Sequence, residues 1–255
     1  MISVVILGAG NVATHLFKAF NKTNEVSVIQ WYNRTLDKLK PYNKQVNTCD
    51  NLDDLVDADL YILTVSDDSI AELSSKLPFE NKLVVHTSGS VGVYDLDKKL
   101  KRGVLYPLQT FSMDADVDFA NVPICIETID KKSYPLLKKV AVSLGSPTKR
   151  VNSDQRRTLH LAAVYVNNFT NQLYRIAHEI TESEGAEFDM LKPLILETAK
   201  KVQDISPYMA QTGPAKRNDK KTINAHLKLL QKQEHKDIYK LLTKSIQNTH
   251  GRKKL

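Results

Sequence analysis

The hydrophobic positions in the first 150 residues form short runs that alternate with stretches of helical periodicity. Residues 4–7 are a continuous apolar run typical of a buried strand, and within residues 11–20 apolar side chains recur every three or four positions. This alternation is typical of βαβ units built around a parallel sheet. Further strands are predicted at residues 26–31, 60–65, 83–86, 124–127 and near 148–151, with a helix over 134–144.

After about residue 152 the strand pattern stops and long helical periods replace it. An apolar stripe from Leu159 to Ile180 predicts one helix over residues 154–184, about 45 Å long. The stripe is either intramolecular core or a subunit interface. Further helices are predicted at residues 188–205, 222–233 and 237–247. The fold class is therefore α/β, with a Rossmann-type doubly wound parallel sheet in residues 1–152 and an all-α domain in residues 153–255.

A glycine-rich turn joins the first predicted strand to the first helix. The segment GAGNVA fits the dinucleotide-binding pattern G-x-G-x-x-A. The first glycine allows a tight turn, the second lets a pyrophosphate approach the backbone, and the alanine allows close packing of helix and strand. A structural glycine turn without a ligand is the alternative. We predict cofactor contacts from Gly8, Gly10, Asn11, Val12 and Ala13.

The end of the second predicted strand indicates which dinucleotide binds. An NAD site usually has an acidic residue there for the ribose 2′-hydroxyl, but residues 26–36 contain none. Arg34 instead offers a planar cation for a 2′-phosphate, and Asn33 and Thr35 offer further hydrogen bonds. The sequence therefore favours NADP, unless Arg34 is only an exposed loop residue.

Polar residues follow two more predicted strands, where open α/β sheets bind ligands. Val65 and Ser66 end one of these strands, and Thr87 and Ser88 end the next, so we predict that all four contact the cofactor. Ser88 could equally be only a turn residue. His86 either faces a ligand as a proton donor or is a buried, hydrogen-bonded histidine.

Polar residues also form a stripe on the predicted long helix. At 3.6 residues per turn, His160, Asn167, Asn171 and His178 point within about 20° of one direction. A solvent-facing stripe is the alternative to a functional one. We predict that His160 and Asn167 act in catalysis and that Asn171 contacts a substrate.

A loop at residues 211–219, rich in hydrogen-bond donors, separates two of the predicted helices. Its segment QTGPAKRND contains Gln211, which could contact a substrate, and Arg217, which could bind an anionic group or face water.

The amino-acid composition and charge argue against several classes of protein. Apolar residues make up 42% and charged residues 25% of the chain, as in ordinary globular proteins. The two cysteines are too few for a disulfide framework or a zinc site, and the initial apolar run is too short to span a bilayer. The formal charge of +7 is spread along the chain, which favours a solvated basic surface over nucleic-acid binding. We expect a cytoplasmic protein with no metal, membrane or nucleic-acid partner.

The order of the motifs GAGNVA, HTSGS, YPLQTF, LHLAAVYVNNF, QTGPAKRND and HLKLL resembles a bacterial family of Rossmann-like proteins with a helical C-terminal domain of unknown function. That family is similar to pyrroline-5-carboxylate reductase, ketopantoate reductase and the deazaflavin-dependent NADP reductases. The resemblance covers nearly the whole chain. It implies an NADP oxidoreductase acting on a small molecule, with dimerisation through the helical domain.

One departure from the wider superfamily restricts the mechanism. β-Hydroxyacid dehydrogenases have a lysine three or four residues before an asparagine pair on the long helix, but here Val164 and Tyr165 occupy those positions. Lysine-assisted oxidation of a hydroxyacid is therefore not expected, and His160 is the nearest candidate acid or base. The expected function is hydride transfer between NADP(H) and a small carbonyl or imine substrate, whose anionic group, if it has one, could bind Arg217. A non-catalytic NADP-binding sensor or scaffold is the alternative, which the missing lysine favours.

Overall fold

The computed structural model describes residues 1–113 and 115–251. Contacts divide the chain into two compact units, Met1–Asn167 and Asn168–Leu255. The domain boundary predicted at residues 152/153 precedes the helix Ser153–Ala163, whereas the contacts group that helix with the sheet. Within the described ranges, no helix is both long and apolar enough to cross a membrane.

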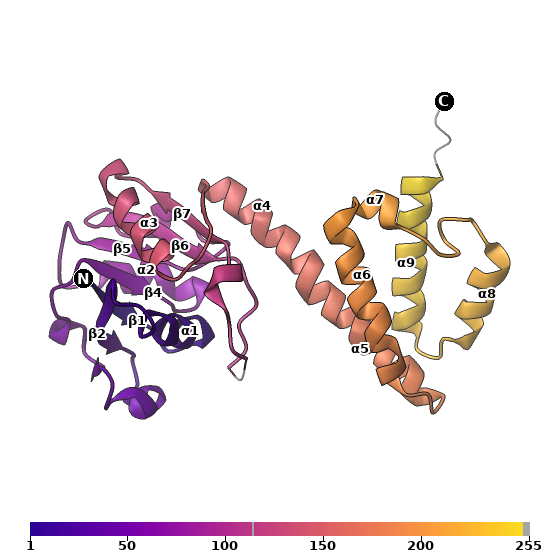
Figure 1. The fold of residues 1–255 in the computed structure, drawn as a ribbon, viewed down its shortest axis with the longest axis horizontal. Coiled ribbons are helices and arrows are strands. Elements are labelled where there is room, and N and C mark those ends of the chain that lie inside the picture. Colours follow the sequence, from indigo (N-terminus) through magenta and orange to yellow (C-terminus); the bar gives the residue numbers. More distant parts are fainter. Residues whose placement is uncertain (114, 252–255) are drawn as a thin grey trace. The chain divides into compact units, whose positions relative to one another are not determined.

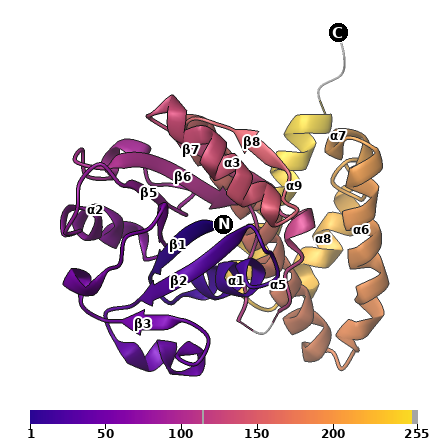
Figure 2. The same cartoon turned by 60° about the vertical axis from the view of Figure 1, so that its left-hand side comes forward.

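The first unit is built on an eight-stranded sheet in the order β3-β2-β1-β4-β5-β6-β7-β8. Its strands are labelled in Figures 1 and 2, with β3 and β8 in Figure 2. The order reverses between β1 and β4, which is the switch point where doubly wound sheets bind ligands. The predicted Rossmann fold is thus confirmed. The strands are β1 (Ile2–Leu7), β2 (Val26–Tyr32), β3 (Asn47–Cys49), β4 (Leu60–Leu63), β5 (Leu83–His86), β6 (Lys101–Pro107), β7 (Ile124–Thr128) and β8 (Thr148–Arg150).

Three features of the sheet differ from the sequence prediction. The pattern missed β3, which is only three residues long. The pattern missed β6, whose run begins with two charged residues, contains Gly103 and ends at Pro107. In addition, β7 pairs with β6 in the antiparallel direction, whereas the other paired strands are parallel. The segment between these strands forms no α-helix among its described residues, and an antiparallel pair needs no crossover helix.

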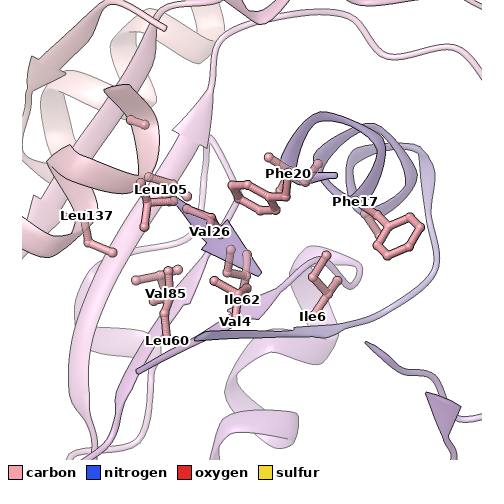
Figure 3. Close-up of a cluster of buried hydrophobic side chains, with 14 of the residues drawn as sticks. Val4, Ile6, Phe17, Phe20, Val26, Leu60, Ile62, Val85, Leu105 and Leu137 are labelled. Carbon is pink, nitrogen blue, oxygen red and sulfur yellow. The ribbon is translucent and has the colours of Figure 1, made fainter. Parts of the chain in front are cut away.

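Helices cover both faces of the sheet (Figure 2). On one face, apolar residues of α1 (Asn11–Phe20) and α3 (Tyr134–Ser143) pack against strand residues such as Val4, Ile6 and Val85 (Figure 3). On the other face, Ile70 of α2 (Asp67–Ser75) packs with Val5, whose side chain points opposite to its neighbours in β1. The sheet therefore has a hydrophobic core on each side. The polar residues that follow its strands lie outside both cores.

The predicted long helix is interrupted. An α-helix, α4 (Ser153–Ala163), leads into a π-helical segment, Val164–Phe169, and then into α5 (Thr170–Ser183). A π-helix bonds residue i to i+5, so it does not keep the 3.6-residue period. The alignment of His160 with Asn167 and later residues, which assumed one continuous α-helix, is therefore wrong.

The second unit is all-helical. A short 3₁₀ turn, Phe188–Leu191, precedes the helix predicted over residues 188–205. Few of its side chains are buried: among residues 168–251 only Ile176, Ala215 and His235 are less than a tenth exposed. Besides α5, the helices are α6 (Lys192–Asp204), α7 (Pro207–Ala210), α8 (Lys220–Leu229) and α9 (Gln233–His250).

Candidate functional site

The turn after β1 needs glycine at its first position. Gly8 has φ +114°, and a Cβ atom there would lie 2.7 Å from the backbone oxygen of Thr64. The indole Nε1 of buried Trp31 donates a hydrogen bond of 2.6 Å to the Gly8 carbonyl. The turn is therefore held close to β4 and cannot accept a side chain without distortion.

The first turn of α1 is open to an anion. Gly10 is the N-cap and supplies no side-chain oxygen to the helix N–H groups, and the first turn contains no acidic residue. Unpaired N–H groups and the helix dipole at such a terminus favour a negatively charged ligand.

A cavity of about 400 Å³ adjoins this turn. It is formed by residues that follow the carboxyl ends of β1, β2 and β4, at the topological switch point. Six residues predicted to bind the cofactor line it: Gly8, Gly10, Asn33, Arg34, Val65 and Ser66.

Cations outnumber acids in this cavity. Lys38 and Lys76 line it together with Arg34, and Glu72 is its acidic residue. Lys76 pairs with Glu72 at 2.5 Å, which lowers the pKa of the Glu72 carboxyl. Among the described residues no carboxylate forms an ion pair with Arg34, which is exposed. Sequence reasoning missed Lys38 and Lys76 because both lie outside the strand-end motifs.

The other predicted cofactor residues do not line the cavity. The Asn11 side chain donates to the Phe111 carbonyl at 2.7 Å, and Ala13 is completely buried against the sheet. Thr35 accepts a hydrogen bond from the Asn33 side chain at its carbonyl, at 2.7 Å. Val12 packs partly buried against the core, and Thr87 donates to the Leu63 carbonyl.

A larger cavity, about 910 Å³, lies elsewhere in the first unit. Residues near the carboxyl ends of α1 and α3 line it, including Lys18, Lys22 and Gly145. It contains none of the residues predicted from the strand-end motifs. Of these two cavities, the smaller one combines the glycine turn with an uncapped helix terminus.

A second polar cluster lies beyond β5 and β6. The Ser88 hydroxyl accepts hydrogen bonds from the backbone N–H groups of Ser90 and Val91, which makes it a turn residue. His160 of α4 lies directly against Gly89, where an added Cβ would come within 2.6 Å of the imidazole Nδ1. The same Nδ1 is 3.1 Å from the hydroxyl of Tyr106 in β6. Sequence reasoning missed Tyr106, although it begins the YPLQTF motif.

His86 is buried beside this polar cluster and is not available as a proton donor. It is 0% exposed, and burial, followed by the charge of Arg156, lowers its pKa to about 4. Its Nδ1 accepts from the Ser88 N–H at 3.2 Å, and its Nε2 has no partner among the described residues. An enclosed imidazole with this lowered pKa carries no second proton to donate at neutral pH, so the prediction of His86 as a proton donor is corrected in favour of a buried, hydrogen-bonded histidine.

Arg156 anchors α4 to the sheet. Its side chain is 0% exposed, forms an ion pair with Glu127 of β7 and donates to the Val91 carbonyl. Glu127 also accepts from the Ser153 N–H at 3.0 Å and from the Ser153 hydroxyl at 2.9 Å. Because residues four apart share a helix face, this anchor determines where His160 meets Gly89 and Tyr106.

The remaining predicted residues are exposed or belong to the second unit. Asn167 is an exposed residue of the π-helical segment, and π-helical turns are frequent at functional sites. Asn171 and Arg217 are exposed in the second unit, and Gln211 is partly exposed. Among the described residues, no cluster of histidine, cysteine or acidic side chains is arranged to hold a metal ion.

Comparisons with known proteins cover both units. Residues 3–89 match the family described as "NADP oxidoreductase coenzyme F420-dependent", and residues 122–246 match a domain of unknown function, DUF2520. No curated protein matches this chain.

Solved structures match over nearly the full length. A "putative NADP oxidoreductase" from Bacteroides fragilis is 36% identical, with 97% of this chain and 98% of that chain covered and a TM-score of 0.87. A 1-pyrroline-5-carboxylate reductase from Streptococcus pyogenes is 15% identical, with coverage of 98% and 97% and a TM-score of 0.65. A reductive aminase from Aspergillus terreus, solved with NADPH and ethyl levulinate, is 13% identical, with coverage of 98% and 95% and a TM-score of 0.71. The last two likenesses show a shared fold.

Proposed function

This chain belongs to a family of NADP oxidoreductases with a C-terminal domain of unknown function, and from that premise we propose that it reduces a small carbonyl or imine compound with NADPH. When bound, NADPH supplies the hydride for the carbon of a C=O or C=N bond. The observation that carries the proposal is the cationic cavity at the switch point, which adjoins an uncapped helix terminus.

The residues of this cavity fit a phosphorylated dinucleotide. Gly8 and Gly10 leave room for a pyrophosphate at the N-terminus of α1, where backbone N–H groups attract anions. Arg34 would hold the 2′-phosphate through its planar guanidinium, with Lys38 close by in the same cavity. Ser66 of the β4 end would donate hydrogen bonds to the cofactor.

His160 is the proposed group that meets the reacting oxygen or nitrogen of the substrate. It lies at the carboxyl ends of β5 and β6, on the Rossmann unit itself, and the imidazole can donate a hydrogen bond or a proton. Asn167, in the same unit, would orient the substrate. No lysine stands at the position that hydroxyacid dehydrogenases use, where this chain has Val164.

The test of this function is NADPH oxidation in the presence of a panel of keto acids, cyclic imines and oxidised coenzyme F420. Turnover of at least one class supports a reductase. Tight binding of NADPH without turnover of any class would favour a sensor or scaffold, and absence of NADPH binding would overturn the proposal.

Replacing Arg34 with alanine should weaken NADP binding by about 10- to 100-fold and leave NAD binding nearly unchanged, because charge-assisted hydrogen bonds to the 2′-phosphate are lost. Titration of both cofactors, followed by quenching of Trp31 fluorescence or by calorimetry, measures the ratio. Lys44→Ala, an exposed cation outside the cavity, is the control and should change neither affinity. An unchanged preference in Arg34→Ala would remove Arg34 from the cofactor site.

We also propose that the protein is a homodimer through its helical unit. Within residues 168–251 many large apolar side chains remain exposed, including Leu194 and Leu196 at 61% and 55%. A unit with so few buried side chains needs a partner surface to cover them, and a second copy of the chain provides the same apolar surface.

The dimer has a direct test in light scattering. Wild-type protein at micromolar concentration should have twice the mass of one chain, and Leu194→Glu should shift it towards the monomer. Lys200→Glu on the same helix is the control for an added acidic side chain. A monomeric wild type would contradict the proposal.

A further inference from the structure

Tyr106 is a buried residue whose hydroxyl group contacts one polar side chain of the described residues. Tyr106 is 8% exposed, and burial raises the pKa of its phenol to about 12, so the oxygen keeps its proton at neutral pH. Across residues 1–113 and 115–251, the hydrogen bond that this hydroxyl makes is with Nδ1 of His160, at 3.1 Å.

The direction of this hydrogen bond follows from the donors that must be satisfied. If Nδ1 carried the imidazole proton and donated it to the tyrosine oxygen, the phenolic proton would need another acceptor. The structure offers it none in the described ranges, and a buried donor without a partner is unfavourable. A phenol that donates to the lone pair of Nδ1 satisfies both groups.

The imidazole ring is also held in place. Gly89 packs so closely against it that an added Cβ would lie 2.6 Å from Nδ1, 2.7 Å from Cγ and 2.9 Å from Cβ. Arg156, one turn earlier in α4, ties the helix to Glu127. The ring is thus restrained by the turn after β5 and by Tyr106.

We infer that Tyr106 is a positioning residue that locks His160 in the neutral tautomer with its proton on Nε2. His160 then presents a fixed N–H donor to its ligand, while Nδ1 stays occupied by the phenol. The Nε2–H group polarises a carbonyl or imine for hydride attack, and water supplies the proton that the reduced oxygen or nitrogen then takes up. This inference rests on the proposed function for its chemical meaning, because it specifies how His160 would act there.

Nitrogen NMR of the full-length protein without cofactor tests the tautomer directly. The seven histidines are labelled with ¹⁵N in their rings, and the His160 signals are identified by their loss in His160→Gln. We expect a pyridine-type Nδ1 and a protonated Nε2 at neutral pH. A His160 ring with its proton on Nδ1 would overturn the inference, and this result needs no variant of Tyr106.

Tyr106→Phe removes the hydroxyl and keeps the ring. It should raise the population of the Nδ1-protonated tautomer about fivefold relative to the Nε2 form, which is the effect of one hydrogen bond of ordinary net strength. Tyr94→Phe is the control, because Tyr94 is 72% exposed and its ring contact with Arg102 does not need the hydroxyl. A purely structural role for Tyr106 would leave the tautomers of His160 unchanged in Tyr106→Phe, and that outcome rejects the inference.

Failure of this inference can be distinguished from failure of the proposed function. The tautomer is measured on the free protein, so a lack of NADPH turnover would count against the reductase and leave the NMR result standing. Where a substrate is found, Tyr106→Phe should lower kcat about fivefold with a smaller change in KM.

Discussion

Replacing Arg156 with methionine should lower the free energy of unfolding of the sheet unit by about 3 to 5 kcal/mol. The guanidinium group is fully buried and forms an ion pair with Glu127, which is itself 14% exposed. Removing only the cation leaves a largely enclosed carboxylate without its partner, which is the costly way to break a buried pair. Denaturant unfolding followed by the fluorescence of Trp31, the chain's one tryptophan, reports on this unit.

The neighbouring arginine provides a matched control. Arg157 pairs with Asp154 on the surface, with side chains 51% and 89% exposed, so Arg157→Met should cost less than about 1 kcal/mol. The double variant Arg156→Met/Glu127→Gln should recover part of the lost stability, because the unpaired charge is gone. Equal losses in Arg156→Met and Arg157→Met would show that Arg156 is not an anchor of α4.

Replacing His160 with alanine should lower turnover by about 10²- to 10³-fold and leave NADP affinity nearly unchanged. The loss is that expected for one preorganised donor that faces the reacting atom, and His160 lies outside the cavity assigned to the cofactor. Val164→Ala, one turn later, is the comparison: it occupies the position of the absent lysine and should affect packing only. Steady-state kinetics, NADP titration and melting temperature are measured on both variants.

A different set of results would show that His160 stabilises the fold and does not take part in the reaction. In that case His160→Ala would reduce the melting temperature and NADP affinity together, with no selective loss of turnover. The ring contacts with Gly89 and Tyr106 make this comparison necessary, since both would be lost in the variant.

The proposed dinucleotide site rests largely on local sequence patterns. A glycine turn between strand and helix, and an arginine after the second strand, depend on residues close together in the sequence, and both line the same cavity. Lys38 and Lys76 join that cavity from segments without a motif, so only the packed fold brings them in. Thr35 and Ala13 are also predicted cofactor contacts, but their side chains have other neighbours. The Thr35 hydroxyl accepts a hydrogen bond from the Asn33 side chain, and Ala13 is completely buried.

The cluster around His160 shows the limit of periodicity. A continuous helix was the simplest interpretation of the spacing from Leu159 to Ile180, because periodicity does not distinguish an α-helix from one interrupted by a π-helical segment. The partners of the histidine come from distant segments: Gly89 follows β5, and Tyr106 ends β6. A local sequence pattern does not predict a contact between residues more than 50 positions apart, such as Tyr106 and His160.

The sequence by itself determined the Rossmann unit, the helical second half and the position of the glycine turn after β1, because alternating strand and helix periods and the φ that glycine permits are local properties. Only the tertiary structure decided the lowered pKa of His86 and the buried ion pair of Arg156. Adjacent arginines in one helix carry the same charge, yet packing buries Arg156 against Glu127 and leaves Arg157 at the surface. Burial also keeps His86 neutral, because an enclosed imidazole loses the water that would stabilise its charged form.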